Sequence, residues 1–193
     1  MKSLLFASHN THKVEEIRIM LEGQYKVLSL PDVGITEDIP EPFDTFEANA
    51  QAKAAYVFQK TGIPAFADDS GLLVDALGNQ PGVLSARYAG PQKNSDDNML
   101  KLLSALKHET NRRARFVTVI AFQVTEAQCH FFNGKVEGII SEKPRGQKGF
   151  GYDPVFIPLG FDQTFGELHE NIKKAISHRA MAMNRFVSFL QSG

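Results

Sequence analysis

Two adjacent carboxylates, Asp68 and Asp69, occupy an otherwise apolar stretch, Phe66-Ala67-Asp68-Asp69-Ser70-Gly71-Leu72-Leu73-Val74. Neighbouring negative charges in apolar surroundings are costly unless a cation or a proton relieves them. A hard divalent cation such as Mg²⁺ prefers carboxylate oxygens. Asp, Ser and Gly are also ordinary turn residues, so we expect a strand over 65–67, a tight turn at Ser70-Gly71 and then a second strand. The stretch indicates either a metal-dependent catalytic centre or a polar turn.

A second polar stretch, Ser8-His9-Asn10-Thr11-His12-Lys13, follows the apolar residues Leu4 to Ala7. Val14, Ile17 and Leu21 come next at helical spacing, which predicts a strand, a polar loop and a helix. A helix N-terminus offers N–H groups and its positive dipole end to an anion. The dipole alone disfavours a lysine in the first turn, so a phosphate would explain Lys13. The alternative is that Asn10 or Thr11 merely caps the helix.

A glycine-rich passage, Gly146-Gln147-Lys148-Gly149-Phe150-Gly151-Tyr152-Asp153-Pro154, lies later in the chain. Its glycines let the backbone bend sharply and present the rings of Phe150 and Tyr152 to a flat ligand. Stacking of a base on such a ring is worth ~1–3 kcal/mol. The alternative is a flexible loop whose rings simply pack.

The last chemical signal is Ser177-His178-Arg179, just downstream of Lys173. Met183, Val187 and Leu190 follow at helical spacing, so Ser177 is well placed to cap a final helix. His178 and Arg179 then lie in its first turn, where an anion or the polar edge of a ligand is expected.

These residues need a framework of strands and helices. Residues 26–30 predict a strand, and Asp44-Thr45-Phe46-Glu47 resembles a capping box that begins a helix ending at Gly62. Lys53 borders the apolar face of this helix. We expect a loop over 85–91, a helix capped by Ser95, and a hairpin of strands 115–124 and 128–140.

Composition restricts the class of protein. The chain has 193 residues with 42% hydrophobic and 22% charged residues, which is typical of a single globular domain. The net charge of −1 gives no global basic field for nucleic acid. Cys129 is the only cysteine, so no intrachain disulfide can form. No segment is typical of a signal peptide or a membrane span, and we expect a cytoplasmic protein that binds neither membranes nor nucleic acid.

These groups together favour a nucleoside triphosphate with Mg²⁺ as the ligand. The cations would bind its phosphates, the carboxylates would bind the metal and the aromatic rings would stack on the base. The same stretches, with Ser85-Ala86-Arg87-Tyr88-Ala89-Gly90, resemble the motifs of the Ham1-like inosine/xanthosine triphosphate pyrophosphatases in their expected order. The resemblance spans nearly the whole chain, so we predict one such domain over residues 1–193. It implies an elongated, two-lobed, homodimeric α/β protein with a long curved mixed sheet, flanking helices and an active-site cleft between the lobes. It also implies Mg²⁺-dependent cleavage of ITP, dITP and XTP to the monophosphate and pyrophosphate.

The resemblance also implies roles for individual residues. Asp69 resembles the general base, and the metal ligands would be Glu41, Asp69 and the neighbouring Asp68. The phosphates would be bound by Ser8, His9, Asn10, Thr11, His12, Lys13, Lys53 and Ser70. The base and sugar would be bound by Phe150, Gly151, Tyr152, Asp153, Lys173, His178 and Arg179. His9 stands where the family usually has glycine, and the proline-rich segment around Glu41 matches the family only loosely.

Three alternatives remain open. One is a related Maf-like pyrophosphatase acting on pyrimidine or modified nucleotides, against which the Ser-His-Arg and Gly-Phe-Gly-Tyr-Asp passages argue. Another is a nucleic-acid-binding module that stacks bases on the glycine-aromatic loop, which the near-neutral charge disfavours. The third is a nucleotide sensor without catalysis, which the presence of the Asp68-Asp69 pair disfavours.

Overall fold

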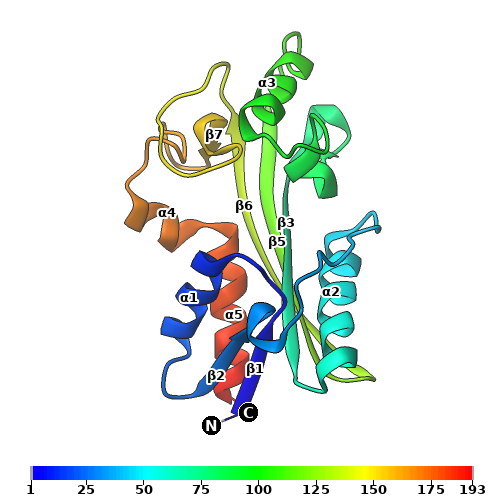
Figure 1. Cartoon of the computed structure of the whole chain (residues 1–193). Helices are drawn as coiled ribbons and strands as arrows, with labels where there is room; N and C mark the ends of the chain where they lie inside the picture. The colour runs from blue at the N-terminus through cyan, green and yellow to red at the C-terminus, as the bar shows by residue number, and fades with distance from the viewer. Residues whose placement is uncertain (1, 193) are drawn as a thin grey trace. The chain divides into compact units, whose positions relative to one another are not determined.

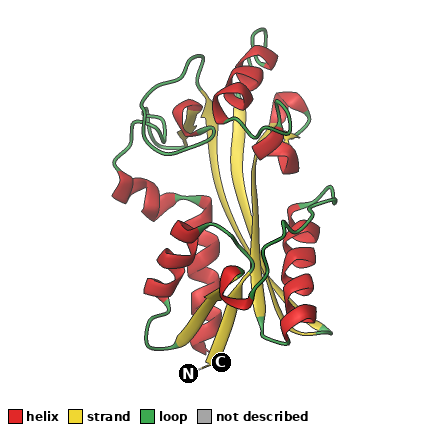
Figure 2. Ribbon diagram, viewed as in Figure 1, coloured by secondary structure: helices red, strands yellow, loops and turns green. Residues whose placement is uncertain are grey.

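The computed structural model describes residues 2–192; the side chains of His12 and Glu16 lie outside the described part. It is an α/β fold with a mixed seven-stranded sheet flanked by helices, which confirms the predicted fold class (Figures 1 and 2). The strand order is β2-β1-β3-β5-β6-β7, with β4 paired to β3. The strands are β1 (Lys2–Phe6), β2 (Tyr25–Ser29), β3 (Ala65–Val74), β4 (Gln80–Pro81), β5 (Arg113–Thr125), β6 (Gln128–Ile140) and β7 (Phe156–Pro158). The helices are α1 (Thr11–Met20), α2 (Phe46–Thr61), α3 (Ser95–Ala105), α4 (Glu170–Ile176) and α5 (His178–Ser192), with short 3₁₀ helices η1 (Pro31–Val33), η2 (Asp75–Leu77), η3 (Gly82–Arg87) and η4 (Asp153–Val155).

The chain forms two compact units. The first comprises Met1–Asp69, Val119–Asn133 and Ala182–Gly193, and the second comprises Ser70–Thr118 and Gly134–Met181. Strands β3, β5 and β6 therefore contribute residues to both units, and so does α5. No helix in the described chain is both long enough and apolar enough to cross a membrane.

In the first unit, helices cover the two faces of the strands. Figure 1 shows α1 and α5 on one side of the strands and α2 on the other. Leu4 and Phe6 of β1 and Phe66 of β3 pack with residues of α1 and α5 in one buried cluster. The Phe66 ring stacks on Phe6 with centroids 4.6 Å apart and lies 4.7 Å from Phe186 of α5. Since side chains alternate along a strand, Phe66 and Asp68 face α1 and α5, whereas Ala67 and Asp69 face the other way.

Strand β3 corrects one prediction. The expected turn at Ser70-Gly71 does not form, because β3 continues from Ala65 to Val74 through both carboxylates. Lys13 of α1 and Asn49 of α2 bond the two acidic side chains within the strand. The stretch is therefore a central strand with a polar middle, and the polar-turn interpretation is wrong.

Other elements agree with the predictions from the sequence or differ from them by a few residues. The predicted hairpin is confirmed as β5 and β6, and α2 ends at Gly62 in the left-handed conformation as expected. Thr45 is the N-cap of α2 and accepts a bond from Ala48 N. Helix α3 is capped by Asn94, one residue before the predicted Ser95, since the longer Asn side chain accepts a bond from Asp97 N. The expected loop over 85–91 begins inside η3.

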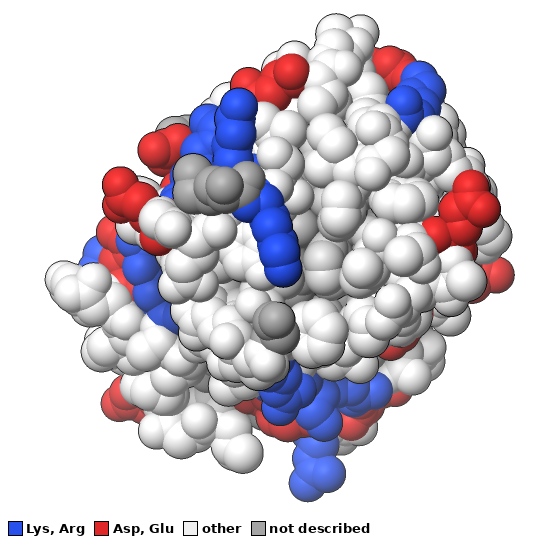
Figure 3. Space-filling model, turned by 90° about the horizontal axis from the view of Figure 1, so that it is seen from below, with Lys and Arg blue, Asp and Glu red and all other residues white. Residues whose placement is uncertain are grey.

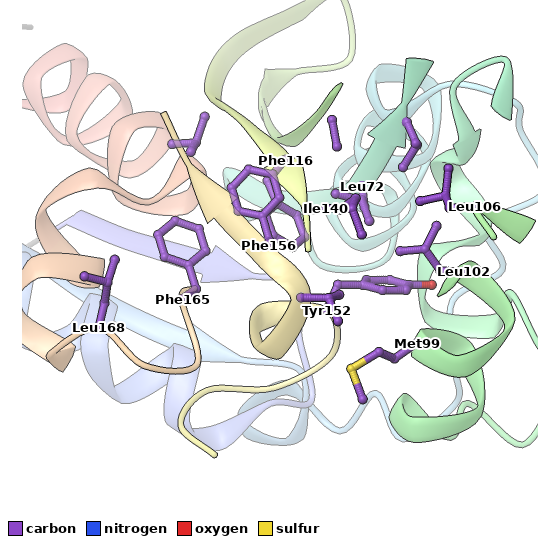
Figure 4. Packing of buried hydrophobic residues seen from close by; sticks show 14 residues of the cluster. Leu72, Met99, Leu102, Leu106, Phe116, Ile140, Tyr152, Phe156, Phe165 and Leu168 are labelled. Carbon is purple, nitrogen blue, oxygen red and sulfur yellow. The ribbon is translucent and has the colours of Figure 1, made fainter. Parts of the chain in front are cut away.

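The second unit has its own aromatic core, shown in Figure 4. Phe116 of β5 lies 4.6 Å from Phe156 of β7, measured between ring centroids, and Phe156 lies 5.3 Å from Phe165. Leu102 and Leu106 of the α3 region and Tyr152 of the glycine-rich passage complete the packing. This core fixes the base of the loop that carries Phe150.

Candidate active site

The two central carboxylates lie on opposite faces of β3. Asp68 is two residues from Phe66 and so faces α1 and α5, whereas Asp69 faces α2. The hydrogen-bond partners agree: Asp68 bonds to Lys13 of α1, and Asp69 bonds to Asn49 of α2. Both carboxylates are 9% exposed. An extended strand points adjacent side chains apart, and the binding of one metal ion by both Asp68 and Asp69 stays a prediction.

On the α1 side, Lys13 Nζ lies 2.8 Å from Asp68 Oδ2 and 3.1 Å from Asp68 Oδ1. We expected a phosphate to neutralise this first-turn lysine, but in the structure a protein carboxylate does so. The Lys13 side chain is 25% exposed and that of Asp68 is 8% exposed. The lysine is thus held in place at the start of α1 while part of it stays open to solvent.

The polar loop before α1 is ordered by its own side chains. Asn10 is the N-cap and accepts a bond from Lys13 N at 3.2 Å, which confirms the capping interpretation. Ser8 Oγ accepts from Asn10 N at 3.1 Å. Thr11 opens α1 and is exposed, and the side chain of His12 lies outside the described part. Phosphate contact by this loop stays a prediction.

His9 fits the loop without the freedom of glycine. Among the described non-glycine residues only Asn79 and Lys93 have a positive φ, so residue 9 does not need a left-handed backbone. His9 Nε2 donates to the carbonyl of Glu37 at 3.1 Å. The imidazole therefore connects the loop to the acidic segment before α2.

On the α2 side, one helix face holds the strand and the acidic segment together. Lys53 Nζ lies 2.5 Å from Glu41 Oε1 and 2.7 Å from the carbonyl oxygen of Asp68. One turn earlier, Asn49 Nδ2 donates to Asp69 Oδ2 at 3.1 Å. The Lys53 side chain is 12% exposed, so its ammonium points inward rather than into bulk water. Lys53 thus links Glu41 to the main chain of β3, while Asn49 on the same helix holds the Asp69 carboxylate.

The donor set suits magnesium only in part. Within the described residues, no group of three or more His, Cys, Asp or Glu side chains is placed to hold a metal ion. Magnesium commonly binds one or two carboxylates and completes its coordination with water and substrate phosphates. Glu41 and Asp69 supply hard oxygen donors of this kind around the α2 side. Asp68 is the least suited of the three predicted ligands, because its side chain faces the other side and pairs with Lys13.

Ser70 begins the second unit and is fixed by a neighbouring hydroxyl. Ser70 Oγ lies 2.7 Å from Thr118 Oγ1, and Thr118 is fully buried. A short hydroxyl pair of this kind restricts the rotamer of Ser70. Its predicted contact with the triphosphate stays a prediction.

The glycine-aromatic loop presents one ring and buries the other. Phe150 is 67% exposed, and Lys173 Nζ and the Arg179 guanidinium lie 5.0 and 5.7 Å from the centre of its ring. Tyr152 is 4% exposed in the core and donates its hydroxyl to the carbonyl of Ser85 at 2.8 Å. The expectation that both rings face a ligand is therefore wrong for Tyr152. Burial raises the pKa of Tyr152 far above its usual value, with Tyr88 adding to the shift, so its hydroxyl stays a donor.

Asp153 holds the loop in shape. Its Oδ2 accepts from Phe150 N at 2.7 Å and from Lys173 Nζ at 2.5 Å. Gly149 has φ +78°, and a Cβ there would lie 2.1 Å from Asp153 Oδ2. Glycine is therefore required for the carboxylate to reach across the loop, and Gly151 has a positive φ as well. A hollow of about 350 Å³ borders Phe150, lined also by Ser95 and Met99 of α3.

The start of α5 is arranged as expected. Ser177 Oγ accepts from Ala180 N at 3.2 Å, which places His178 and Arg179 in the first turn. The His178 ring stacks on Phe116 with centroids 4.8 Å apart. In the second unit, Arg179, Lys173 and Phe150 thus form a cationic and aromatic group, held at its base by Asp153.

Sequence reasoning missed two buried positioning residues, Asn49 and Thr118. Asn49 lies four residues before Lys53 on α2, so helical spacing already places the two side chains on one face. Thr118 gave no signal, since a threonine in a strand is ordinary. Burial raises the pKa of the Cys129 thiol, which disfavours a reactive thiolate.

Comparison with known proteins identifies the family. Residues 4–189 match the sequence model of the Ham1 family. The chain belongs to the Ham1 family. A relative from Flavobacterium johnsoniae, named dITP/XTP pyrophosphatase, is 51% identical over 187 residues, covering 97% of each chain. A Bacillus subtilis protein of the same name is 45% identical, covering 100% of this chain and 98% of its own.

Solved Ham1 structures are also similar over the full length. A HAM1 protein from Coxiella burnetii superposes with a TM-score of 0.96 at 37% identity and covers 100% of both chains. The Ham1 protein of Staphylococcus aureus has a TM-score of 0.95 at 37% identity and covers 99% of both chains. The sequence resemblance to this family is therefore confirmed.

One prediction concerns the base of the aromatic loop. Tyr152→Phe keeps the ring but leaves the Ser85 carbonyl without its donor, so the free energy of unfolding should fall by ~1–3 kcal/mol. Urea denaturation measures this directly. Tyr56→Phe is the matched control, because the Tyr56 hydroxyl bonds the exposed Glu37. Its free energy of unfolding should fall by less than that of Tyr152→Phe. Equal stability of Tyr152→Phe and the unmodified protein would show that the hydroxyl does not anchor the loop.

Proposed function

We propose that the chain hydrolyses deaminated, non-standard purine nucleoside triphosphates, such as ITP, dITP and XTP, to the monophosphate and pyrophosphate. Membership of the Ham1 family and the names of its relatives support this proposal. The observation that carries it is the buried Asp69 carboxylate, gathered with Glu41 and Lys53 on the α2 side of β3. The proposal includes magnesium dependence, a homodimer and a cytoplasmic location.

The chemistry assigns one task to each group of the first unit. Asp69 accepts a proton from the attacking water or orients it toward the α-phosphorus. Lys13, Lys53 and the N-terminus of α1 bind the phosphates and oppose their negative charge. Magnesium held by Glu41 and Asp69 would supply further charge neutralisation on the leaving pyrophosphate. Positioning and electrostatics contribute most of the rate in such reactions.

The groups of the second unit bind the nucleoside in this proposal. Phe150 is exposed and offers a ring face for the purine. Arg179 and His178 donate to the carbonyl at position 6 of hypoxanthine or xanthine, where adenine carries an amino group. Asp153 and the buried Tyr152 keep the loop in shape rather than stack on the base.

The nucleic-acid alternative finds no support on the face of the molecule that Figure 3 shows. Figure 3 shows acidic and basic side chains intermixed around an uncharged area on this face. A nucleic-acid surface needs clustered basic groups. We therefore propose no second function.

A panel of nucleotides tests the proposal. ITP, dITP and XTP should be hydrolysed with kcat/KM values a few orders of magnitude above that for ATP, with pyrophosphate as the product and activity lost in chelator. Coupled assays that detect pyrophosphate and phosphate separately make the measurement. Preferential hydrolysis of pyrimidine nucleotides, or release of phosphate alone, would contradict it.

The variant Arg179→Ala tests how the purine base is recognised. When the Arg179 guanidinium faces the amino group of adenine, hydrogen-bond donors of both groups stay unpaired, which costs ~1–3 kcal/mol of binding free energy for each donor. The variant should lower kcat/KM for ITP steeply and change it little for ATP, so that their ratio falls. Arg185→Ala, on the same helix but bonded to the carbonyl of Asn133, is the control and should keep the ratio. An unchanged ratio in Arg179→Ala would place base recognition elsewhere, most directly in the Phe150 loop.

A further inference from the structure

The side chain of Asn49 is 1% exposed and bonds in three directions. Its Oδ1 accepts from Phe43 N at 3.0 Å, and its Nδ2 donates to the carbonyl of Phe43 at 3.0 Å. The same Nδ2 donates to Asp69 Oδ2 at 3.1 Å. Both amide hydrogens and the amide oxygen are thus engaged, which fixes the orientation of the side chain.

These bonds connect three parts of the first unit. Phe43 follows Glu41 by two residues. The two hydrogen bonds from Asn49 to the main chain of Phe43 therefore fix the segment that carries Glu41. Lys53, one turn later on α2, bonds Glu41 and the carbonyl of Asp68. Asn49 and Lys53 therefore hold the same segment and the same strand from one face of α2.

We propose that Asn49 is a positioning residue for Asp69. It fixes one oxygen of the Asp69 carboxylate and holds the Glu41 segment beside it, so both carboxylates are in place before substrate binds. This inference rests on the proposed function, in which Asp69 acts on the attacking water. An amide is the side chain that fits: serine is too short to reach both partners, and an aspartate would lose the donors and repel Asp69.

The chain contains a matched control. Asn98 of α3 is 3% exposed and holds a loop in the same way: its Oδ1 accepts from Ala89 N at 2.6 Å and its Nδ2 donates to the carbonyl of Ala86 at 2.9 Å. Asn98 makes these bonds to main-chain groups within the second unit. Comparison of the two residues separates the effect on Asp69 from the general effect of losing a buried amide.

The first experiment compares Asn49→Ala with Asn98→Ala. We expect both variants to lower the urea midpoint of unfolding, but only Asn49→Ala to lower kcat for ITP, by about 10- to 100-fold. The KM for ITP should stay within about twofold, because Asn49 touches Asp69 and not the groups that bind phosphate. Thr45→Ala, which removes the N-cap of α2 and keeps Asn49, should leave kcat within about twofold. Asn49→Ser gives the same comparison if the alanine variant does not fold.

The second experiment is a kinetic double-mutant cycle with Asp69→Asn. Asp69→Asn alone should lower kcat by about 100-fold or more. Adding Asn49→Ala should lower it by less than about twofold further, because residues that act through one another are not additive. A full additional loss in the double variant would show that Asn49 acts on the fold and would overturn the proposal.

The outcomes also distinguish this inference from the proposed function. An unmodified protein that does not hydrolyse ITP, or a fully active Asp69→Asn, contradicts the proposed function and the inference together. An inactive Asp69→Asn with a normal kcat in folded Asn49→Ala contradicts the positioning role alone.

Discussion

The alternation of side chains along β3 is the constraint on which the site depends. An extended backbone points Asp68 and Asp69 to opposite faces, so each carboxylate needs its own partner from a different helix. Lys13 of α1 meets Asp68, and Asn49 of α2 meets Asp69. Lys53 bonds the main chain between them and brings Glu41 to the α2 side. The two carboxylates are thereby separated and hydrogen-bonded within a central strand.

In the second unit, buried polar groups order the loop that carries Phe150. The ring of Phe150 is exposed, and the buried carboxylate of Asp153 keeps the backbone of the loop ordered. Asp153 bonds the amide of Phe150 and the ammonium of Lys173, and Gly149 leaves room for it. The Tyr152 hydroxyl fixes the base of the loop to Ser85. Exposed Phe150 is thus supported by buried polar contacts, and Tyr152, two residues later, packs in the aromatic core (Figure 4).

Most elements could be predicted from local patterns, whereas the partners of the site residues could not. The hairpin of β5 and β6, the cap at Ser177 and the end of α2 at Gly62 depend on residues close in sequence, and all are confirmed. The continuous β3 was missed because Asp-Asp-Ser-Gly has local turn preferences that contacts from α1 and α2 override. Tyr152 was predicted to present its ring, since loop composition does not show which aromatic residue a core will bury. The Asn49–Asp69 contact joins residues 20 positions apart, which helical spacing alone does not determine.

The central claim is that Asp69 directs water to the α-phosphorus of the triphosphate. Hydrolysis of ITP in ¹⁸O-labelled water, followed by mass spectrometry of both products, tests it directly. Attack at the α-phosphorus forms the new P–O bond on the nucleotide, so the account predicts one ¹⁸O atom in the monophosphate and unlabelled pyrophosphate. Label in the pyrophosphate would mean attack at the β-phosphorus and would contradict the account.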